Sequence, residues 1–327
     1  LGAGVMGSAI AAHFAGAGIR THLLDRVPPD LDGVDTDDPR KRNSFARRGL
    51  ETAVKTKPAA FFDLDDASLV QVGNFTDHMS RLRECDLVIE AVMERLEVKI
   101  SLFDRVIPHL SDEAILASNT SGLSVKDMSD SLPIDVQSRF LVMHFFNPVR
   151  YMRLLELVSG PRTDRLVVER IARLGEFLGK GIVYGKDTPN FVANRIGVSA
   201  MMDTFSAMTE LGLSIEEVDK IAGKPMARPK SAVFRTADVV GIDTLIHVAR
   251  NCYDNLPDDE EREIFKIPEW IQKLVSTGRK GSKTKAGFYK KEGKKIRVLE
   301  PSTLEYRDLE KVRFDSLSAI KGAQGSK

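Results

Sequence analysis

The chain has 327 residues, 42% of them hydrophobic, and its 48 basic and 47 acidic side chains leave a formal net charge of +1. This length suits about two domains, and the balanced charge argues against nucleic acid or a membrane surface as an obligatory partner. Because there are only two cysteines and no apolar run of about 18 residues, we expect a cytoplasmic protein without disulfides, metal or membrane insertion.

A glycine turn opens the chain. Gly2-Ala3-Gly4-Val5-Met6-Gly7 has the G-x-G-x-x-G spacing and leads into small residues that suit a helix packed on a sheet. Asp25 follows about 20 residues later, where a dinucleotide-binding fold places the acid that binds the adenine ribose. These features predict an NAD site whose carboxylate disfavours NADP, and a glycine turn without a ligand is the alternative. Such a turn follows a strand, so we expect the native chain to begin before Leu1.

A basic segment comes after residues 28–38, which are rich in Pro and Asp and are expected to form a surface loop. Arg48, Lys55 and Lys57 lie in or beside a stretch with the apolar spacing of a helix. A solvated helix face is the ordinary interpretation of such a charge run. The functional interpretation is a surface for the phosphates of a coenzyme A tail.

Short apolar segments then alternate with helical ones, which predicts an α/β fold with a doubly wound, mostly parallel sheet of the Rossmann type. Glu90, Glu94 and Lys99 follow one predicted strand, and the sequence Ser-Asn-Thr-Ser at 118–121 follows the next. The hydroxyls of the second group either cap a helix or bind a substrate oxygen. The predicted strands are 69–72, 86–89, 114–117, 140–143, 154–158 and 181–184, and the predicted helices are 99–107 and 165–178.

His144 follows the bulky apolar run 140–143, so it should emerge near the C-terminal end of a buried strand, the edge where ligands bind. Asn147 and Glu156 complete a proton-handling group in otherwise apolar surroundings. An imidazole titrates near neutral pH, and a carboxylate partner can fix its tautomer, so this group predicts a general base. For such a pair taken alone, the alternative is a histidine satisfied within the core.

From Asn190 onward the pattern is mainly helical, with helices predicted at 191–211, 215–222 and 236–256. Pro and Asp at 186–189 mark the boundary between the two patterns. We therefore predict an NAD-binding domain at 1–187 with a truncated first strand, and an all-α domain for substrate binding or dimerisation at 188–290. Residues 291–327 are predicted to be a connector or the start of a further region.

Taken in order, the motifs resemble those of the L-3-hydroxyacyl-CoA dehydrogenase family. The resemblance covers residues 1–290, and it includes the spacing of twelve between His144 and Glu156. It is closest to long bacterial members that carry this dehydrogenase at their N-terminus and an enoyl-CoA hydratase region beyond it. One departure is Asn190, where the family usually has glycine. The matching segments are the glycine turn, 86–94, 118–121, 144–148, 152–156, 190–195 and 283–289.

The resemblance implies oxidation of L-3-hydroxyacyl-CoA to 3-ketoacyl-CoA with NAD+ in fatty-acid β-oxidation. It makes His144 the general base and Glu156 the residue that orients it. Ser121 and Asn194 would bind the C3 oxygen or the thioester carbonyl, and Asn147 would hold the catalytic group together. The implied cofactor contacts are Gly2, Gly4, Val5, Met6, Gly7, Asp25, Glu94, Lys99, Ser121, Asn147 and Lys283.

Two other functions stay open. One is a 3-hydroxyacid dehydrogenase, a class that shares only the glycine turn and uses a lysine as acid/base. The other is a catalytically idle NAD-binding protein, which would keep His144 and Glu156 in an apolar site without benefit.

The resemblance also implies partners. The expected small-molecule partner is an acyl-CoA substrate. The family pairs through the helical domain, so we expect a homodimer or an intramolecular pairing with residues downstream of this chain. Asn194 belongs to the second domain, so the site should be complete only when the two domains close on the substrate.

Overall fold

The computed structural model describes residues 1–31 and 38–319. These divide into two compact units, Leu1–Val192 and Ala193–Lys327. Most of the loop predicted at 28–38 and the last part of the predicted connector, 320–327, lie outside the described residues. Within the described part of the chain, no helix has both the length and the apolarity needed to cross a bilayer.

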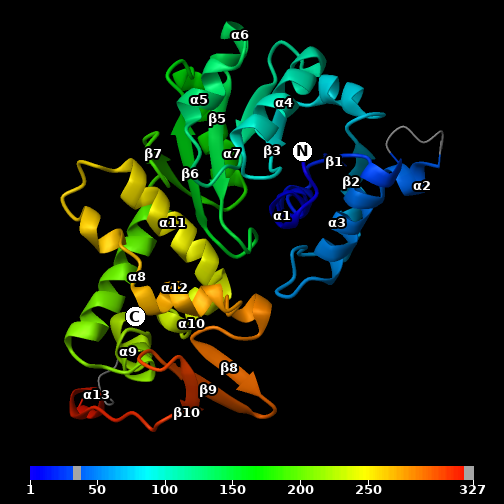
Figure 1. Cartoon of the computed structure of the whole chain (residues 1–327). Helices are drawn as coiled ribbons and strands as arrows, with labels where there is room; N and C mark the ends of the chain where they lie inside the picture. The colour runs from blue at the N-terminus through cyan, green and yellow to red at the C-terminus, as the bar shows by residue number, and fades with distance from the viewer. Residues whose placement is uncertain (32–37, 320–327) are drawn as a thin grey trace. The chain divides into compact units, whose positions relative to one another are not determined.

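The first unit is an α/β fold with two groups of strands (Figure 1). β1 and β2 pair in parallel, and β3 to β7 form a five-stranded sheet in sequential order in which only β5 and β6 are antiparallel. The predicted Rossmann-type, mostly parallel sheet is therefore confirmed. The strands are β1 (Thr21–Asp25), β2 (Val70–Asn74), β3 (Leu87–Glu90), β4 (Ile115–Ser118), β5 (Phe140–Phe145), β6 (Leu154–Ser159) and β7 (Gly181–Gly185). The helices are α1 (Val5–Ala15), α2 (Pro39–Arg42), α3 (Ser44–Lys55), α4 (Leu96–Val106), α5 (Val125–Asp130), α6 (Ile134–Gln137) and α7 (Arg165–Phe177).

The first two residues lie between the two groups of strands. The amino group of Leu1 donates to the carbonyl of Ile89 at 2.6 Å, and the N–H of Ala91 donates back to Leu1 at 2.7 Å. On the other side, the N–H of Gly2 donates to the carbonyl of Leu24 at 2.7 Å. A cavity of about 610 Å³ is lined by β1, β3 and the apolar side of α1.

Helices cover both faces of the five-stranded sheet. Along β5, Phe140 and Val142 pack with α4 and α5, whereas Leu141 and Met143 pack with α1 and α7. Successive residues of a strand face opposite sides of the sheet. The side chain of His144, near the end of β5, therefore lies on the same face of the sheet as those of Phe140 and Val142.

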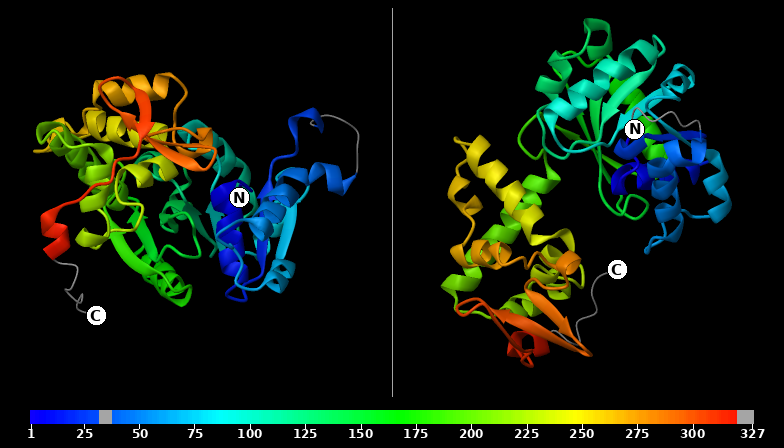
Figure 2. Two further views of the ribbon diagram at one scale, coloured as in Figure 1. Left: turned by 90° about the horizontal axis from the view of Figure 1, so that it is seen from below. Right: turned by 45° about the vertical axis from the view of Figure 1, so that its right-hand side comes forward.

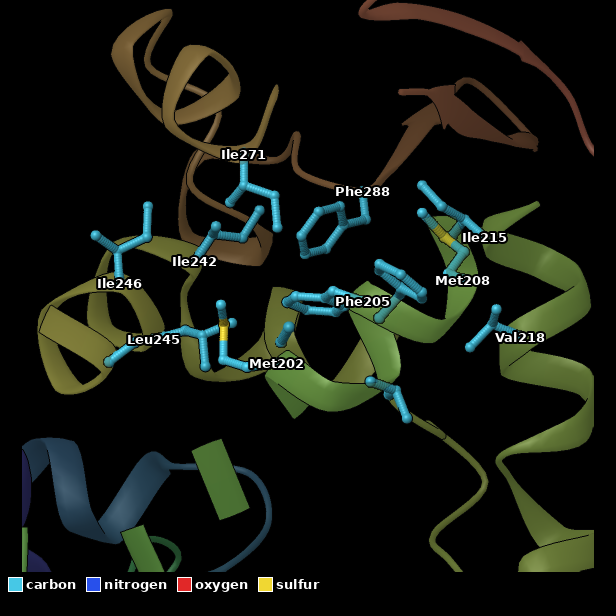
Figure 3. Close-up of a cluster of buried hydrophobic side chains, with 14 of the residues drawn as sticks. Met202, Phe205, Met208, Ile215, Val218, Ile242, Leu245, Ile246, Ile271 and Phe288 are labelled. Carbon is cyan, nitrogen blue, oxygen red and sulfur yellow. The ribbon is translucent and has the colours of Figure 1, made fainter. Parts of the chain in front are cut away.

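The second unit is mainly helical, and it also contains a small antiparallel sheet, drawn in orange to red in Figure 2. Its core surrounds three phenylalanines, with ring centroids 4.8 Å apart for Phe205 and Phe234 and 4.9 Å apart for Phe234 and Phe288. Figure 3 shows aliphatic and methionine side chains from several helices packed around Phe205 and Phe288. The helices are α8 (Ala193–Glu210), α9 (Ile215–Ile221), α10 (Phe234–Val240), α11 (Ile242–Asn255), α12 (Glu269–Ser276) and α13 (Asp315–Ala319). The strands are β8 (Tyr289–Glu292), β9 (Lys295–Glu300) and β10 (Glu305–Asp308).

Two features of this unit differ from the sequence interpretation. The helix predicted at 236–256 is two helices, because Gly241 has a φ of 103° and interrupts the helical backbone between α10 and α11. Strands β8 to β10 begin in the last two residues of the stretch predicted to be all-α, 188–290, and continue into the stretch predicted to be a connector, 291–327. Val298 and Leu299 of β9 are fully buried in the core of the unit, and the charged residues around them made the segment resemble a polar linker.

Candidate active site

His144 and Glu156 are opposite one another on a pair of antiparallel strands. β5 and β6 are joined by a hairpin, and their register pairs these two residues directly. Directly opposite residues of an antiparallel pair have side chains on the same face. The Nδ1 atom of His144 is 2.7 Å from Oε2 of Glu156, and the two residues are 5% and 0% exposed. The carboxylate of Glu156 therefore occupies the Nδ1 side of the ring, and Nε2 is the other ring nitrogen.

Aromatic rings and backbone groups hold this pair in place. The ring of His144 has its centroid 4.3 Å from that of Phe146 and 6.0 Å from that of Phe191. The second carboxylate oxygen of Glu156, Oε1, accepts the N–H of Val192 at 3.2 Å. Glu156 thus binds both the imidazole and the last residue of the first unit.

The backbone just before Val192 explains one departure from the family pattern. Asn190 and Phe191 have φ angles of 61° and 52°, in the left-handed region that favours glycine. Asparagine tolerates this conformation better than most residues. Asn190 can therefore take the place of a glycine, whereas the bulky Phe191 is strained there and is 2% exposed.

The basic side chains of Lys180 and Arg150 hold the hairpin that connects β5, which carries His144, to β6, which carries Glu156. The amine of Lys180 donates to the carbonyl oxygens of Val149 and Met152, the latter at 3.0 Å, and burial lowers the pKa of Lys180 to about 8. The guanidinium of Arg150, in the hairpin itself, donates to the carbonyl oxygen of Phe61 at 2.8 Å. The hairpin is thereby tied to the start of β7 and to the segment that follows α3.

The glycine turn has the shape of an anion cradle. A Cβ on Gly7 would lie 1.8 Å from the carbonyl oxygen of Gly2, so only glycine allows α1 to begin so close to the turn. A Cβ on Gly4 would meet nothing within 4 Å, so the turn is open on that side. Gly4 is the N-cap of α1, and the first turn of this helix has neither a side-chain cap nor an acidic residue. The helix N-terminus therefore keeps its capacity to bind an anion.

A cavity of about 450 Å³ brings several predicted residues together beside this turn. The carboxylate of Asp25, at the end of β1, accepts the N–H of Ala3 at 2.6 Å and so joins the turn to the strand. Lys55 does not line this cavity. The predicted residues that do are Gly4, Val5, Asp25, Arg48, Lys57 and Asn147.

A second predicted group meets at the ends of β3 and β4. Oε1 of Glu94 accepts the N–H of Ser121 at 2.8 Å, its hydroxyl at 3.1 Å and the hydroxyl of Thr120 at 2.5 Å. Oε2 of Glu94 is 3.1 Å from the amine of Lys99. Burial alone would raise the pKa of Glu94, but Lys99 and these hydrogen bonds outweigh it and hold the pKa below its usual value. The Ser121 hydroxyl directed at Glu94 must turn before it can donate to a substrate oxygen.

The two remaining predicted residues, Asn194 and Lys283, lie in the second unit. Asn194 is in the first turn of α8. The amine of Lys283 forms an ion pair with Asp243 at 2.5 Å within the same unit. Their catalytic and cofactor roles stay predictions.

Comparison with known protein families shows to which family the chain belongs. The model of the 3-hydroxyacyl-CoA dehydrogenase NAD-binding domain matches residues 1–188, and that of the family's C-terminal domain matches residues 191–291. The chain belongs to the 3-hydroxyacyl-CoA dehydrogenase family. This confirms the resemblance found in the sequence and the prediction of NAD as cofactor.

Individual relatives of the dehydrogenase family agree with this assignment. A Bacillus subtilis protein named as a probable 3-hydroxyacyl-CoA dehydrogenase is 45% identical over the whole chain, which spans 42% of that protein's length. The mitochondrial hydroxyacyl-coenzyme A dehydrogenase of Sus scrofa is 31% identical, with 89% of each chain covered. The crystal structure of an (S)-3-hydroxybutyryl-CoA dehydrogenase from Ralstonia eutropha superposes with a TM-score of 0.70 at 26% identity, covering 88% of this chain and 95% of that one.

The residues of the candidate site fit a dinucleotide. The uncapped N-terminus of α1 and the open side of Gly4 suit a diphosphate. The carboxylates of Asp25 and Glu94 suit the hydroxyls of two riboses, because a carboxylate only accepts hydrogen bonds and a ribose hydroxyl can donate one.

Sequence reasoning missed several residues that shape the candidate site. Lys180 belongs to no motif, and the motif at 190–195 did not indicate that Phe191 packs near His144, because the partners of both residues are distant in the sequence. Asn119 accepts the N–H of Phe145 at 2.9 Å through its side-chain oxygen and so holds the end of β5. Glu90 was visible as an acid at a strand end, but its partner could not be read from the sequence.

Proposed function

We propose that the chain oxidises L-3-hydroxyacyl-CoA to 3-ketoacyl-CoA with NAD+, with His144 as general base. The observation that carries this proposal is the buried hydrogen bond of 2.7 Å between His144 and Glu156. Burying these polar groups costs free energy, and that cost is understandable if the pair transfers a proton. The family of the chain supplies the reaction class.

The proposed mechanism follows from the two nitrogens of the imidazole. Oxidation of a secondary alcohol requires removal of the hydroxyl proton together with a hydride, and bound NAD+ supplies the hydride acceptor. With Nδ1 occupied by Glu156, His144 takes the hydroxyl proton at Nε2. The carboxylate stabilises the imidazolium that forms, and it keeps the ring in the tautomer whose Nε2 can accept. The Phe146 and Phe191 rings exclude water from this proton transfer.

An acyl-CoA is the proposed substrate because basic side chains line the same cavity as residues of the glycine turn. Arg48 and Lys57 line the 450 Å³ cavity together with Asp25 and Asn147. The two cations suit the phosphates of a coenzyme A tail, and Lys55 is a weaker candidate because it does not line the cavity. A role in fatty-acid β-oxidation follows from this substrate class.

The domain roles are proposals as well. We assign cofactor binding to residues 1–187 and substrate binding or pairing to residues 188–290, which agrees with the division of the fold after Val192. Asn194 would bind the C3 oxygen or the thioester carbonyl once the domains close. Because the chain spans 42% of its Bacillus subtilis relative, activities of the rest of such a protein lie outside this proposal.

Consumption of NADH with acetoacetyl-CoA, and then with longer 3-ketoacyl-CoAs, tests the proposal. The wild-type chain should consume NADH, and His144→Gln should lose about a hundred- to ten-thousandfold in kcat, the usual contribution of a general base. If the folded wild-type chain consumes no more NADH than His144→Gln, the proposal is wrong. An idle NAD-binding protein would then be the better description, provided that NADH still binds.

A further inference from the structure

A buried ion pair joins Glu90 to Lys99, one of the predicted cofactor residues. Glu90 ends β3, and Lys99 lies in α4. Their side chains are 0% and 1% exposed, and the amine is 2.7 Å from Oε1 of Glu90. Ion pairs buried to this degree usually cost more in desolvation than they return, and an apolar pair of similar volume is often at least as stable. Stability alone therefore does not explain these two residues.

The remaining contacts of Glu90 hold its carboxylate rigidly. Oε1 also accepts the N–H of Val92 at 2.7 Å, and Oε2 accepts the hydroxyl of Ser118 at 2.5 Å. Ser118 is the last residue of β4 and pairs with Glu90 in the sheet. The carboxylate is thus fixed to two neighbouring strands, and it fixes the amine of Lys99 in turn.

Lys99 is shared between two carboxylates that differ in exposure. Its amine is 2.7 Å from Glu90 but 3.1 Å from Glu94, whose side chain is 37% exposed. One cation between two carboxylates leaves a net charge of −1, and Glu94 is the partner that faces outward. Oε1 of Glu94 already accepts from Thr120 and Ser121, whereas Oε2 contacts the amine of Lys99 and can accept one further donor.

We infer that Glu90 is a positioning residue for the cofactor: it holds Lys99 at the end of β3, so that Glu94 keeps an oxygen available for a ribose hydroxyl. This inference rests on the proposed role of Glu94 and Lys99 in binding NAD. Without the charge of Glu90, the buried amine has only Glu94 to neutralise it. The amine then takes the oxygen of Glu94 that the ribose needs.

Glu90→Gln tests the inference, because glutamine keeps the volume and can still accept the N–H of Val92 but carries no charge. Fluorescence titration with NADH gives the dissociation constant and the number of binding sites separately. We expect a dissociation constant about tenfold higher with an unchanged number of sites, the effect of losing roughly one charge-assisted hydrogen bond. A merely structural role would reduce the number of sites or the melting temperature and leave the dissociation constant unchanged, and that result would overturn the inference.

Two control variants separate charge from other effects. Glu97 is an exposed residue of α4, the helix that contains Lys99, and its carboxylate forms an ion pair with Arg95. Glu97→Gln should leave NADH binding within about twofold of wild type. Ser118→Ala removes the hydroxyl donor to Glu90 but keeps the ion pair, and it should weaken NADH binding by less than about threefold. If Ser118→Ala weakens binding as much as Glu90→Gln, the charge of Glu90 is not the cause and the inference fails.

A double variant covers the case in which Glu90→Gln does not fold. Glu90→Gln with Lys99→Met removes both charges and leaves no buried charge unpaired. It should fold and bind NADH as tightly as Lys99→Met alone, because without the amine the charge of Glu90 no longer affects the oxygen of Glu94. Binding about tenfold weaker than that of Lys99→Met would refute the inference. Failure of the proposed function gives a different result, namely normal NADH binding without turnover of acetoacetyl-CoA by the wild-type chain.

Discussion

Glu156→Gln is expected to abolish most catalysis while leaving the fold intact. The two carboxylate oxygens contact different groups: Oε2 contacts His144, and Oε1 accepts the N–H of Val192. An N–H must face an acceptor, so the carbonyl oxygen of the new glutamine should take the Val192 side. Its NH₂ group then faces Nδ1 of His144 and donates to it.

This reversal places the ring proton of His144 on the wrong nitrogen. When Nδ1 accepts a hydrogen bond, a neutral imidazole carries its proton on Nε2 and cannot take one from a substrate hydroxyl. In serine proteases, the corresponding exchange of an aspartate for asparagine lowers kcat by about 10⁴ through the same change of tautomer. For Glu156→Gln we expect a loss in kcat of about 10²–10⁴.

Steady-state rates of NADH consumption with acetoacetyl-CoA measure the effect, and thermal unfolding checks the fold. Glu169→Gln is the matched control, since Glu169 is in α7 and forms an exposed ion pair with Arg165, and its kcat should stay within about twofold of wild type. The reasoning would be refuted if Glu156→Gln kept more than about a tenth of the wild-type kcat. It would also fail if the loss of rate matched a loss of folded protein.

Gly7→Ala should lower the free energy of unfolding in urea by at least about 1–3 kcal/mol because its Cβ would lie 1.8 Å from a carbonyl oxygen, whereas Gly4→Ala, with nothing within 4 Å, should unfold like wild type. Equal stabilities would contradict the geometry of the turn. Asp25→Ser should reduce the preference for NADH over NADPH, measured as a ratio of kcat/KM, by about tenfold or more because a like charge opposite the 2′-phosphate is removed; an unchanged ratio would show that Asp25 does not face the ribose. Burial raises the pKa of Asp238 from 3.8 to about 6, so the folded chain binds more protons than the unfolded chain between these values. The measured quantity is the unfolding free energy of wild type minus that of Asp238→Asn. This difference should fall by up to about 3 kcal/mol as pH rises from about 4 to about 6, and it should stay level above pH 6. A difference that does not change with pH would be inconsistent with this pKa.

The sequence predicted most strands and helices of the first unit because their apolar runs are short, regular and separated by polar turns. It also predicted His144 and Glu156 as a pair through their spacing. It did not predict that β5 and β6 are antiparallel, since short apolar runs do not indicate strand direction. That direction is what places the imidazole opposite the carboxylate.

Tertiary contacts account for what the sequence could not show. Glu90 is separated from Lys99 by a turn and the start of a helix, and only the packing of α4 against the sheet brings the two together. In the second unit, Gly241 breaks a continuous helical pattern, and β9 has only a short apolar stretch among charges. Each of these depends on neighbours that are distant in the chain.

The contact between Glu156 and Val192 has a consequence for engineering. A chimera that exchanges the helical unit for that of another dehydrogenase needs a crossover point near residue 190. A crossover before Asn190 would replace the two left-handed residues and the N–H that Glu156 accepts, and a different linker would then set the orientation of the carboxylate. A crossover after Val192 keeps that segment with its own strand pair, so the contacts of Glu156 with His144 and with the N–H of Val192 would be retained.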